Sequence, residues 1–109
     1  MNILSRIEAV IQARQQNANP DSSYVASLLH SGTDRILKKI GEEATEVVIA
    51  AKGGDAPEPC VHEIADLWFH LMVLMAHKRI PLTTVAAELE RRFGTSGLEE
   101  KAARPKNSA

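Results

Sequence analysis

The sequence has little of what marks several common classes of protein. Its 109 residues include a single cysteine, Cys60, which cannot form an internal disulfide, so a reducing compartment is expected. The formal net charge is only −1, from 13 basic and 14 acidic residues, and this balance indicates neither nucleic-acid nor membrane binding. No uncharged apolar run reaches the roughly 18 residues that a membrane span needs. Alternation of Val, Ile and Thr at period two is scarce, so we expect no β-strand.

Two motifs are also missing. Residues 1–6 lack the charged and apolar regions of a signal peptide, so we expect a cytoplasmic protein. No glycine-rich loop ending in Gly-Lys-Ser/Thr is present, which argues against a P-loop nucleotide enzyme. A chain of this length should form one domain, and its core is small enough that oligomerisation would help to stabilise it.

Apolar residues at helical spacing run through most of the chain and predict an all-α bundle of four to five helices. The expected helices cover residues 2–16 and 23–31, a third that runs to about residue 52, residues 60–78 and residues 82–93. Residues 1–94 would form the helical domain. Residues 95–109 lack an apolar stripe and would form a C-terminal tail. Ser22 or Ser23 should cap the second helix, Gly32 should end it, and Thr33 or Asp34 should cap the third.

Two clusters of acidic residues lie inside these helical patterns. Glu43 and Glu46, with Glu42 beside them, edge the apolar stripe of the third helix, and three-residue spacing puts two side chains on neighbouring turns of one face. Glu63 and Asp66 lie in the fourth helix, which is apolar in nearly every direction and is therefore expected in the protein interior. The short break between the helices should make them antiparallel, so that the two acid pairs face each other.

Four facing carboxylates predict a metal ion. At about 5 Å and an effective dielectric of about 20, each like-charged pair costs on the order of 3 kcal/mol, which a divalent cation would offset. An all-oxygen site suits Mg²⁺, with Mn²⁺ as a substitute, better than Zn²⁺. The residues alone leave open that the acids are plain surface charge, above all those of the third helix.

A ferritin-like di-iron centre is a rival of a different class, because it also places carboxylates inside a helical bundle. Its signature requires Glu-x-x-His, and no histidine follows a glutamate of either cluster by three residues. A site with oxygen donors only favours phosphate chemistry over oxygen activation.

Basic side chains near the third-helix acids are candidates for holding phosphate oxygens. Lys39 comes first, because it shares the edge occupied by Glu43 and Glu46. The other candidates are Lys38, Arg35 and Lys52. For each of them an ordinary solvated side chain is an equally open interpretation.

His70 lies on the same strip of the fourth helix as Glu63 and Asp66. It is either an outer-shell partner of the metal ligands or a hydrogen-bonded core histidine, and we prefer the second interpretation. His30 and His62 receive no role from the sequence.

The acidic pattern carries a family resemblance. Glu43-x-x-Glu46, sixteen intervening residues and Glu63-x-x-Asp66 resemble the ExxE…ExxD motif of the all-α, MazG-like nucleotide pyrophosphatases. Longer strings are similar to those of the phosphoribosyl-ATP pyrophosphatases of histidine biosynthesis, and the likeness runs from about residue 23 to residue 104. These strings are residues 23–28, 36–52 and 63–70.

The resemblance implies an activity. The activity is Mg²⁺-dependent hydrolysis of the α–β phosphoanhydride of 1-(5-phosphoribosyl)-ATP, giving 1-(5-phosphoribosyl)-AMP and pyrophosphate. A homodimer is expected from the residues themselves, because the helix at 60–76 has more apolar surface than one small bundle can cover, and the helix at 82–93 would be a second contact. The implied metal ligands are Glu43, Glu46, Glu63 and Asp66, with Glu42 and Glu43 in catalytic roles. The second helix would lie beside the substrate, whereas composition alone suggests only that Tyr24 and its apolar neighbours pack. The tail at 95–109 would order against a partner subunit.

Two other functions stay open. A house-cleaning pyrophosphatase acting on dUTP, dCTP or damaged nucleotides would share the metal site and differ in its base and ribose pocket. A non-enzymatic helical dimerisation module would carry the acids as surface charge. The chain is too short to contain a fused second enzyme domain for a following cyclohydrolase step.

Overall fold

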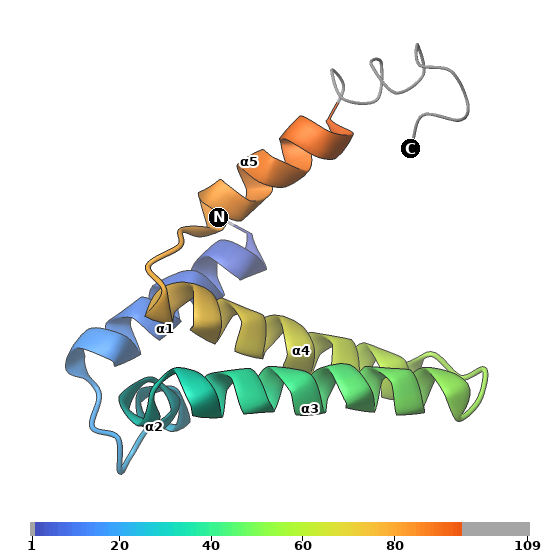
Figure 1. Cartoon of the computed structure of the whole chain (residues 1–109), viewed down its shortest axis with the longest axis horizontal. Coiled ribbons are helices and arrows are strands. Elements are labelled where there is room, and N and C mark those ends of the chain that lie inside the picture. Colours follow the sequence, from blue (N-terminus) through green and yellow to red (C-terminus); the bar gives the residue numbers. More distant parts are fainter. Residues whose placement is uncertain (1, 95–109) are drawn as a thin grey trace. The chain divides into compact units, whose positions relative to one another are not determined.

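The computed structural model describes residues 2–94 and shows five α-helices, with no β-strand in that range (Figure 1). The helices are α1 (Ile3–Asn17), α2 (Tyr24–Ser31), α3 (Thr33–Lys52), α4 (Glu58–His77) and α5 (Leu82–Phe93). The all-α prediction is therefore confirmed, and each helix begins and ends within a few residues of its expected bounds. The tail at 95–109, with its predicted ordering on a partner subunit, lies outside the described residues. Among the described helices, none is long and apolar enough to cross a membrane.

Side chains and one glycine define the ends of the first two helices. Asn2 Oδ1 accepts a hydrogen bond from the Ser5 amide at 2.9 Å, and Ser23 Oγ accepts one from the Ala26 amide at 3.2 Å. Each bond satisfies an amide that has no partner within the helix. α2 ends at Gly32, whose φ of 94° is costly for a residue with a Cβ atom. The predicted Ser23 cap and Gly32 stop are confirmed.

The start of α3 differs from the prediction. Its N-cap is Gly32, no side chain caps it, and Thr33 is already its first helical residue, so the predicted Thr33 or Asp34 cap is wrong. The reason is geometric, because one glycine ends α2 and begins α3 and leaves no residue between the helices to act as a cap. Thr33 Oγ1 instead hydrogen-bonds His77 Nε2 at 2.8 Å, which ties the start of α3 to the end of α4.

Contacts divide the chain into one unit spanning Met1–Arg79, which holds α1 to α4, and a second that begins at Ile80 and holds α5. The core of the first unit draws on all four of its helices. Its buried apolar side chains are Ile11, Val25, Leu28, Ile36, Met72 and Val73. Burying each such side chain contributes about 1.5–3 kcal/mol relative to leaving it in water. The division into residues 1–94 and a tail stays a prediction.

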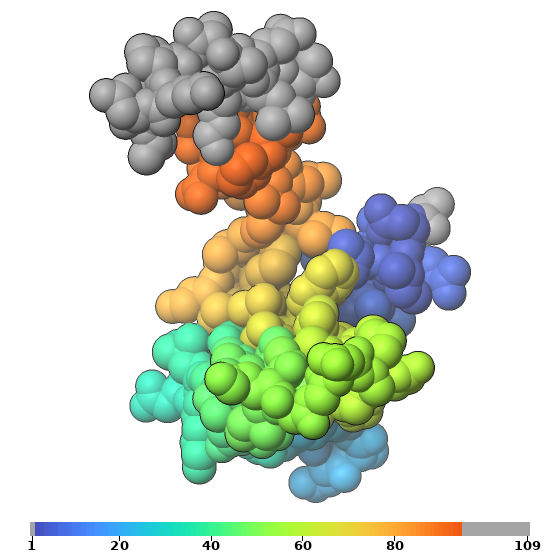
Figure 2. All heavy atoms as spheres, turned by 90° about the vertical axis from the view of Figure 1, so that its right-hand side faces the viewer, coloured from blue at the N-terminus to red at the C-terminus, as the bar shows by residue number. Residues whose placement is uncertain are grey.

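α3 and α4 run side by side and antiparallel, as the short break between them predicted (Figure 1). In Figure 2 the turn that joins them faces the viewer, with the end of α3 packed on the start of α4. This pairing brings the helix that carries Glu43 and Glu46 next to the helix that carries Glu63 and Asp66.

α4 is less enclosed than its composition predicts. Its buried residues are His70, Met72 and Val73, whereas Val61 and Trp68 are 61% and 55% exposed. The prediction of an interior helix is therefore wrong for the single chain, because the other helices cover only part of the surface of α4. α3 also exposes large apolar side chains, namely Leu37, Val48 and Ile49.

α5, in the second unit, is amphipathic and has no buried residue. It exposes the large apolar side chains Val85, Leu89 and Phe93. On its polar face Glu88 Oε1 lies 2.6 Å from Arg91 Nη2 and 2.8 Å from Arg92 Nε. Hydrogen bonds from Arg91 and Arg92 lower the pKa of Glu88 to about 2.

Candidate metal and phosphate site

Glu63 and Asp66 come together on α4, and His62 joins them. One ligand atom from each of these three side chains lies within 4.8 Å of the other two. Glu63 and Asp66 are half-buried, whereas His62 is exposed. The two carboxylates supply the hard oxygen donors that Mg²⁺ prefers. The three-residue spacing thus brings the carboxylates of Glu63 and Asp66 close together, and their role as metal ligands stays a prediction.

Sequence reasoning gave His62 no role. His62 Nε2 lies 3.4 Å from Asp66 Oδ2, and the two residues are four apart along α4. That spacing puts side chains on adjacent turns of one helix face and was the available signal. Exposed pairs of this kind contribute little to stability. The main consequence of the contact is that it places an imidazole nitrogen, a potential metal ligand, next to the two carboxylates.

Lys39 lies against the two acids that follow it on α3. Its Nζ is 3.6 Å from Glu42 Oε2 and 3.7 Å from Glu43 Oε1. The Glu43 side chain is only 13% exposed, against 49% for Glu42, so Glu43 is the better enclosed carboxylate. Tyr24 on α2 has the largest effect on the pKa of Lys39 and raises it. Glu42 and Glu43 raise it further, against an opposing effect of burial. The lysine is thus a persistent cation beside the α3 carboxylates.

Glu43 and Glu46 are not part of the close group on α4. Within residues 2–94, the side chains whose potential ligand atoms gather within 4.8 Å are His62, Glu63 and Asp66. Pairing of α3 with α4 puts the two acid pairs on neighbouring helices, with Glu46 exposed. A single site built from all four carboxylates stays a prediction.

Arg35 connects α3 to α2. Its Nη1 donates hydrogen bonds to Ser27 Oγ and Ser31 Oγ, both at 2.9 Å. Arg35 and Lys39 are four residues apart and therefore share one face of α3. The basic surface of α3 thus extends from Lys39 towards α2.

The other two predicted phosphate contacts lie less favourably. Lys38 is exposed and comes one residue before Lys39, about 100° round the helix and away from the Glu43 edge. Lys52 is exposed in the last turn of α3, about 20 Å along the axis from Lys39. There its charge also complements the carboxyl end of the helix dipole.

His70 has the surroundings of a hydrogen-bonded core histidine, which was the preferred interpretation. It is 6% exposed, and its Nε2 lies 2.9 Å from the Tyr24 hydroxyl. Its Nδ1 lies 2.8 Å from the backbone oxygen of Asp66, so this bond is made to the main chain and does not involve the Asp66 carboxylate. Composition alone suggested that Tyr24 packs, and the resemblance placed its helix beside the substrate; the side chain is 47% exposed and its hydroxyl meets His70.

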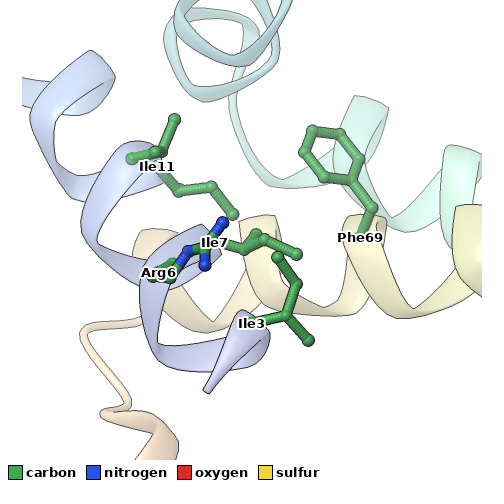
Figure 3. Close-up of a pocket in the computed structure, with 6 residues that line it drawn as sticks. Ile3, Arg6, Ile7, Ile11 and Phe69 are labelled. Atoms are coloured by element: carbon green, nitrogen blue, oxygen red, sulfur yellow. The ribbon is translucent and has the colours of Figure 1, made fainter. Parts of the chain in front are cut away.

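An open pocket of about 260 Å³ lies elsewhere, between α1 and α4 (Figure 3). It is lined by Ile3, Arg6, Ile7, Val10, Ile11 and Phe69. No carboxylate is among these residues, so the pocket does not offer a metal site.

The sequence matches the family described as phosphoribosyl-ATP pyrophosphohydrolase over residues 4–93. The phosphoribosyl-ATP pyrophosphatase of Trichlorobacter lovleyi is 59% identical over 103 residues, which cover 94% of each chain. That of Geobacter metallireducens is 57% identical over 96% of this chain and 94% of its own. That of Variovorax paradoxus is 59% identical over 93% of this chain and 84% of its own. The chain belongs to the phosphoribosyl-ATP pyrophosphohydrolase family.

Proposed function

We propose that this protein hydrolyses 1-(5-phosphoribosyl)-ATP to 1-(5-phosphoribosyl)-AMP and pyrophosphate, the second step of histidine biosynthesis, in the cytoplasm. The observation that carries the proposal is the family match, which spans α1 to α5. The placement of Lys39, Glu43, Glu63 and Asp66 on the paired helices α3 and α4 supports it, because triphosphate chemistry needs both metal ligands and a cation.

The donor set fits magnesium. The close group on α4 offers two carboxylates, Glu63 and Asp66, beside the exposed imidazole of His62. The predicted partners on α3 are carboxylates as well. Glu43, Glu46, Glu63 and Asp66 would hold Mg²⁺, or Mn²⁺ in its place. When bound, the ion polarises phosphoryl oxygens and offsets negative charge at the α–β anhydride.

The residues of α3 would handle the leaving group and the proton. Lys39 binds an oxygen of the departing pyrophosphate, and Arg35, on the same face of α3, attracts the triphosphate. Lys38 lies away from this face and adds only long-range attraction. The oxygen of a water molecule forms a bond to the α-phosphorus while the α–β anhydride bond breaks and pyrophosphate leaves. Glu42, the more exposed acid beside Lys39, accepts the water proton, and Glu43 orients that water.

One assay tests this function against the two other candidates. With Mg²⁺ present, pyrophosphate release from phosphoribosyl-ATP should exceed release from ATP, dUTP or dCTP by at least ~100-fold in kcat/KM, because a site with contacts to the phosphoribosyl group rejects substrates that lack it. Faster release from dUTP or dCTP would identify a house-cleaning pyrophosphatase. Release from none of these substrates would favour a helical dimerisation module.

A homodimer explains the apolar surface of α3 and α4. Val48 and Ile49 are 59% and 58% exposed, in the same unit as Val61 and Trp68 of α4. A second copy of the chain would cover such surface, as in obligate interfaces that resemble a core cut in half.

Light scattering at micromolar protein should therefore give twice the mass of the chain. Trp68→Glu should shift the mass towards the monomer, because it would bury a charge in the interface. Val10→Glu, at a 50% exposed apolar position on α1, is the matched control and should leave the dimer intact. A monomeric wild-type protein would rule out this assembly.

A further inference from the structure

Tyr24 contacts α4 directly, and its own helix is bonded to α3, so it lies next to both helices that carry the predicted site. Its hydroxyl lies 2.9 Å from His70 Nε2 on α4. Its ring stacks on that of Phe69, also on α4, with the centroids 6.4 Å apart and the planes 20° apart. Its own helix, α2, is bonded to α3, because Arg35 Nη1 donates to Ser27 Oγ and Ser31 Oγ, both at 2.9 Å. Tyr24 belongs to α2, so its bond to α4 and the Arg35 bonds of α2 to α3 together connect the three helices.

The direction of the hydrogen bonds follows from the partners of His70. The backbone oxygen of Asp66 can only accept, so His70 Nδ1, at 2.8 Å from it, carries the proton. In the neutral ring Nε2 is then an acceptor, and the Tyr24 hydroxyl donates to it. The Asp66 carbonyl thereby fixes the imidazole, and the imidazole fixes the phenol. The Tyr24 hydroxyl is therefore the donor in its bond to α4.

We propose that Tyr24 is a positioning residue for the hydrolysis, holding through His70 the turn of α4 that carries Asp66 in register with Lys39 of α3. The inference rests on the proposed function. Glu63 and Asp66 belong to one helix and Lys39 and Glu43 to another, so the spacing of the two helices decides whether both sets reach the same triphosphate. A misplacement of about 1 Å in such an arrangement can cost about 100-fold in rate.

A second bond of the same type provides a matched control. Thr33 Oγ1 of α3 lies 2.8 Å from Nε2 of His77 on α4, so it too joins a hydroxyl to an imidazole between helices. His77 is eleven residues beyond Asp66, roughly 16 Å along the helix axis. Loss of this bond should weaken the bundle without moving the predicted ligands.

The experiment compares Tyr24→Phe with Thr33→Val. For both variants we would measure the urea midpoint, the affinity for Mg²⁺ alone by calorimetry without substrate, and kcat with phosphoribosyl-ATP. Both variants should shift the urea midpoint by similar amounts. Tyr24→Phe alone should lose about 10–100-fold in magnesium affinity or kcat, the range seen when partners of metal ligands are removed. If Tyr24→Phe matches Thr33→Val in magnesium affinity and kcat, the inference is overturned and Tyr24 serves packing only.

A second pair of variants decides the matter if Tyr24→Phe does not fold. His70→Gln keeps an acceptor for the Tyr24 hydroxyl, whereas His70→Leu removes it. We expect His70→Gln to retain most of the magnesium affinity and His70→Leu to lose it, and equal affinities would overturn the inference.

Glu63→Gln separates the two proposals. Unchanged magnesium affinity in that variant contradicts the metal site itself, whereas a loss there together with wild-type affinity in Tyr24→Phe contradicts only the role of Tyr24.

Discussion

Glu63→Gln should lower kcat about 100-fold and leave the helix content unchanged. The substitution keeps the size of the side chain and removes one charged oxygen donor from the pair that lies within 4.8 Å on α4. Metal-assisted charge stabilisation is worth several kcal/mol, and about 1.4 kcal/mol corresponds to a tenfold change in rate. The measurement is pyrophosphate release across a magnesium titration, with circular dichroism to follow the fold. The magnesium concentration for half-maximal rate should rise as well.

Glu46→Gln tests the α3 half of the site in the same assay. It should show the same loss if the α3 and α4 carboxylates share the metal. Glu58→Gln is the matched control, because Glu58 lies on α4 but is exposed in its first turn. Wild-type rates for both Glu63→Gln and Glu46→Gln at every magnesium concentration would contradict the ligand assignment. A loss for Glu63→Gln alone would restrict the metal site to α4.

Asp66→Asn should abolish most of the stabilisation that magnesium confers. A ligand that binds only the folded state stabilises it by RT ln(1 + [L]/Kd), about 2.7 kcal/mol at a hundredfold excess over Kd. Wild type should gain this amount between EDTA and millimolar MgCl₂, and the variant should gain much less. The measurement is thermal melting of both proteins in the two buffers.

In EDTA, without magnesium, the Asp66→Asn variant should melt at the same temperature as wild type or slightly above it. Asp66→Asn removes repulsion from Glu63 but also the contact with His62, whose Nε2 is 3.4 Å from Asp66 Oδ2. The Asp66 side chain is 42% exposed, so solvent weakens both effects and the net change should be small. Asp55→Asn, at an exposed position between α3 and α4, is the control and should respond to magnesium as wild type does. A variant that melts well below wild type in EDTA, or gains as much from magnesium, would show that Asp66 is structural.

Much of the fold was predictable because the signals that specify it are local. The apolar spacing of α3, the Ser23 cap and the Gly32 stop each depend on residues within one or two helical turns. The antiparallel pairing of α3 and α4 followed from the shortness of the segment that joins them. The pairing of Glu63 with Asp66 and of Lys39 with Glu43 also followed, since residues three or four apart on a helix are neighbours.

The sequence by itself determined the five helices, the order in which they occur and which acids share a helix turn. Only the tertiary structure decided which side chains each helix face packs against and which faces stay exposed. It assigned the Tyr24 hydroxyl to His70, 46 residues away, and left Trp68 exposed where composition had predicted burial. Helical periodicity specifies the direction in which a side chain points and not the partner that it finds there. That partner depends on the distances and crossing of packed helices, which are set by contacts between residues far apart in the chain.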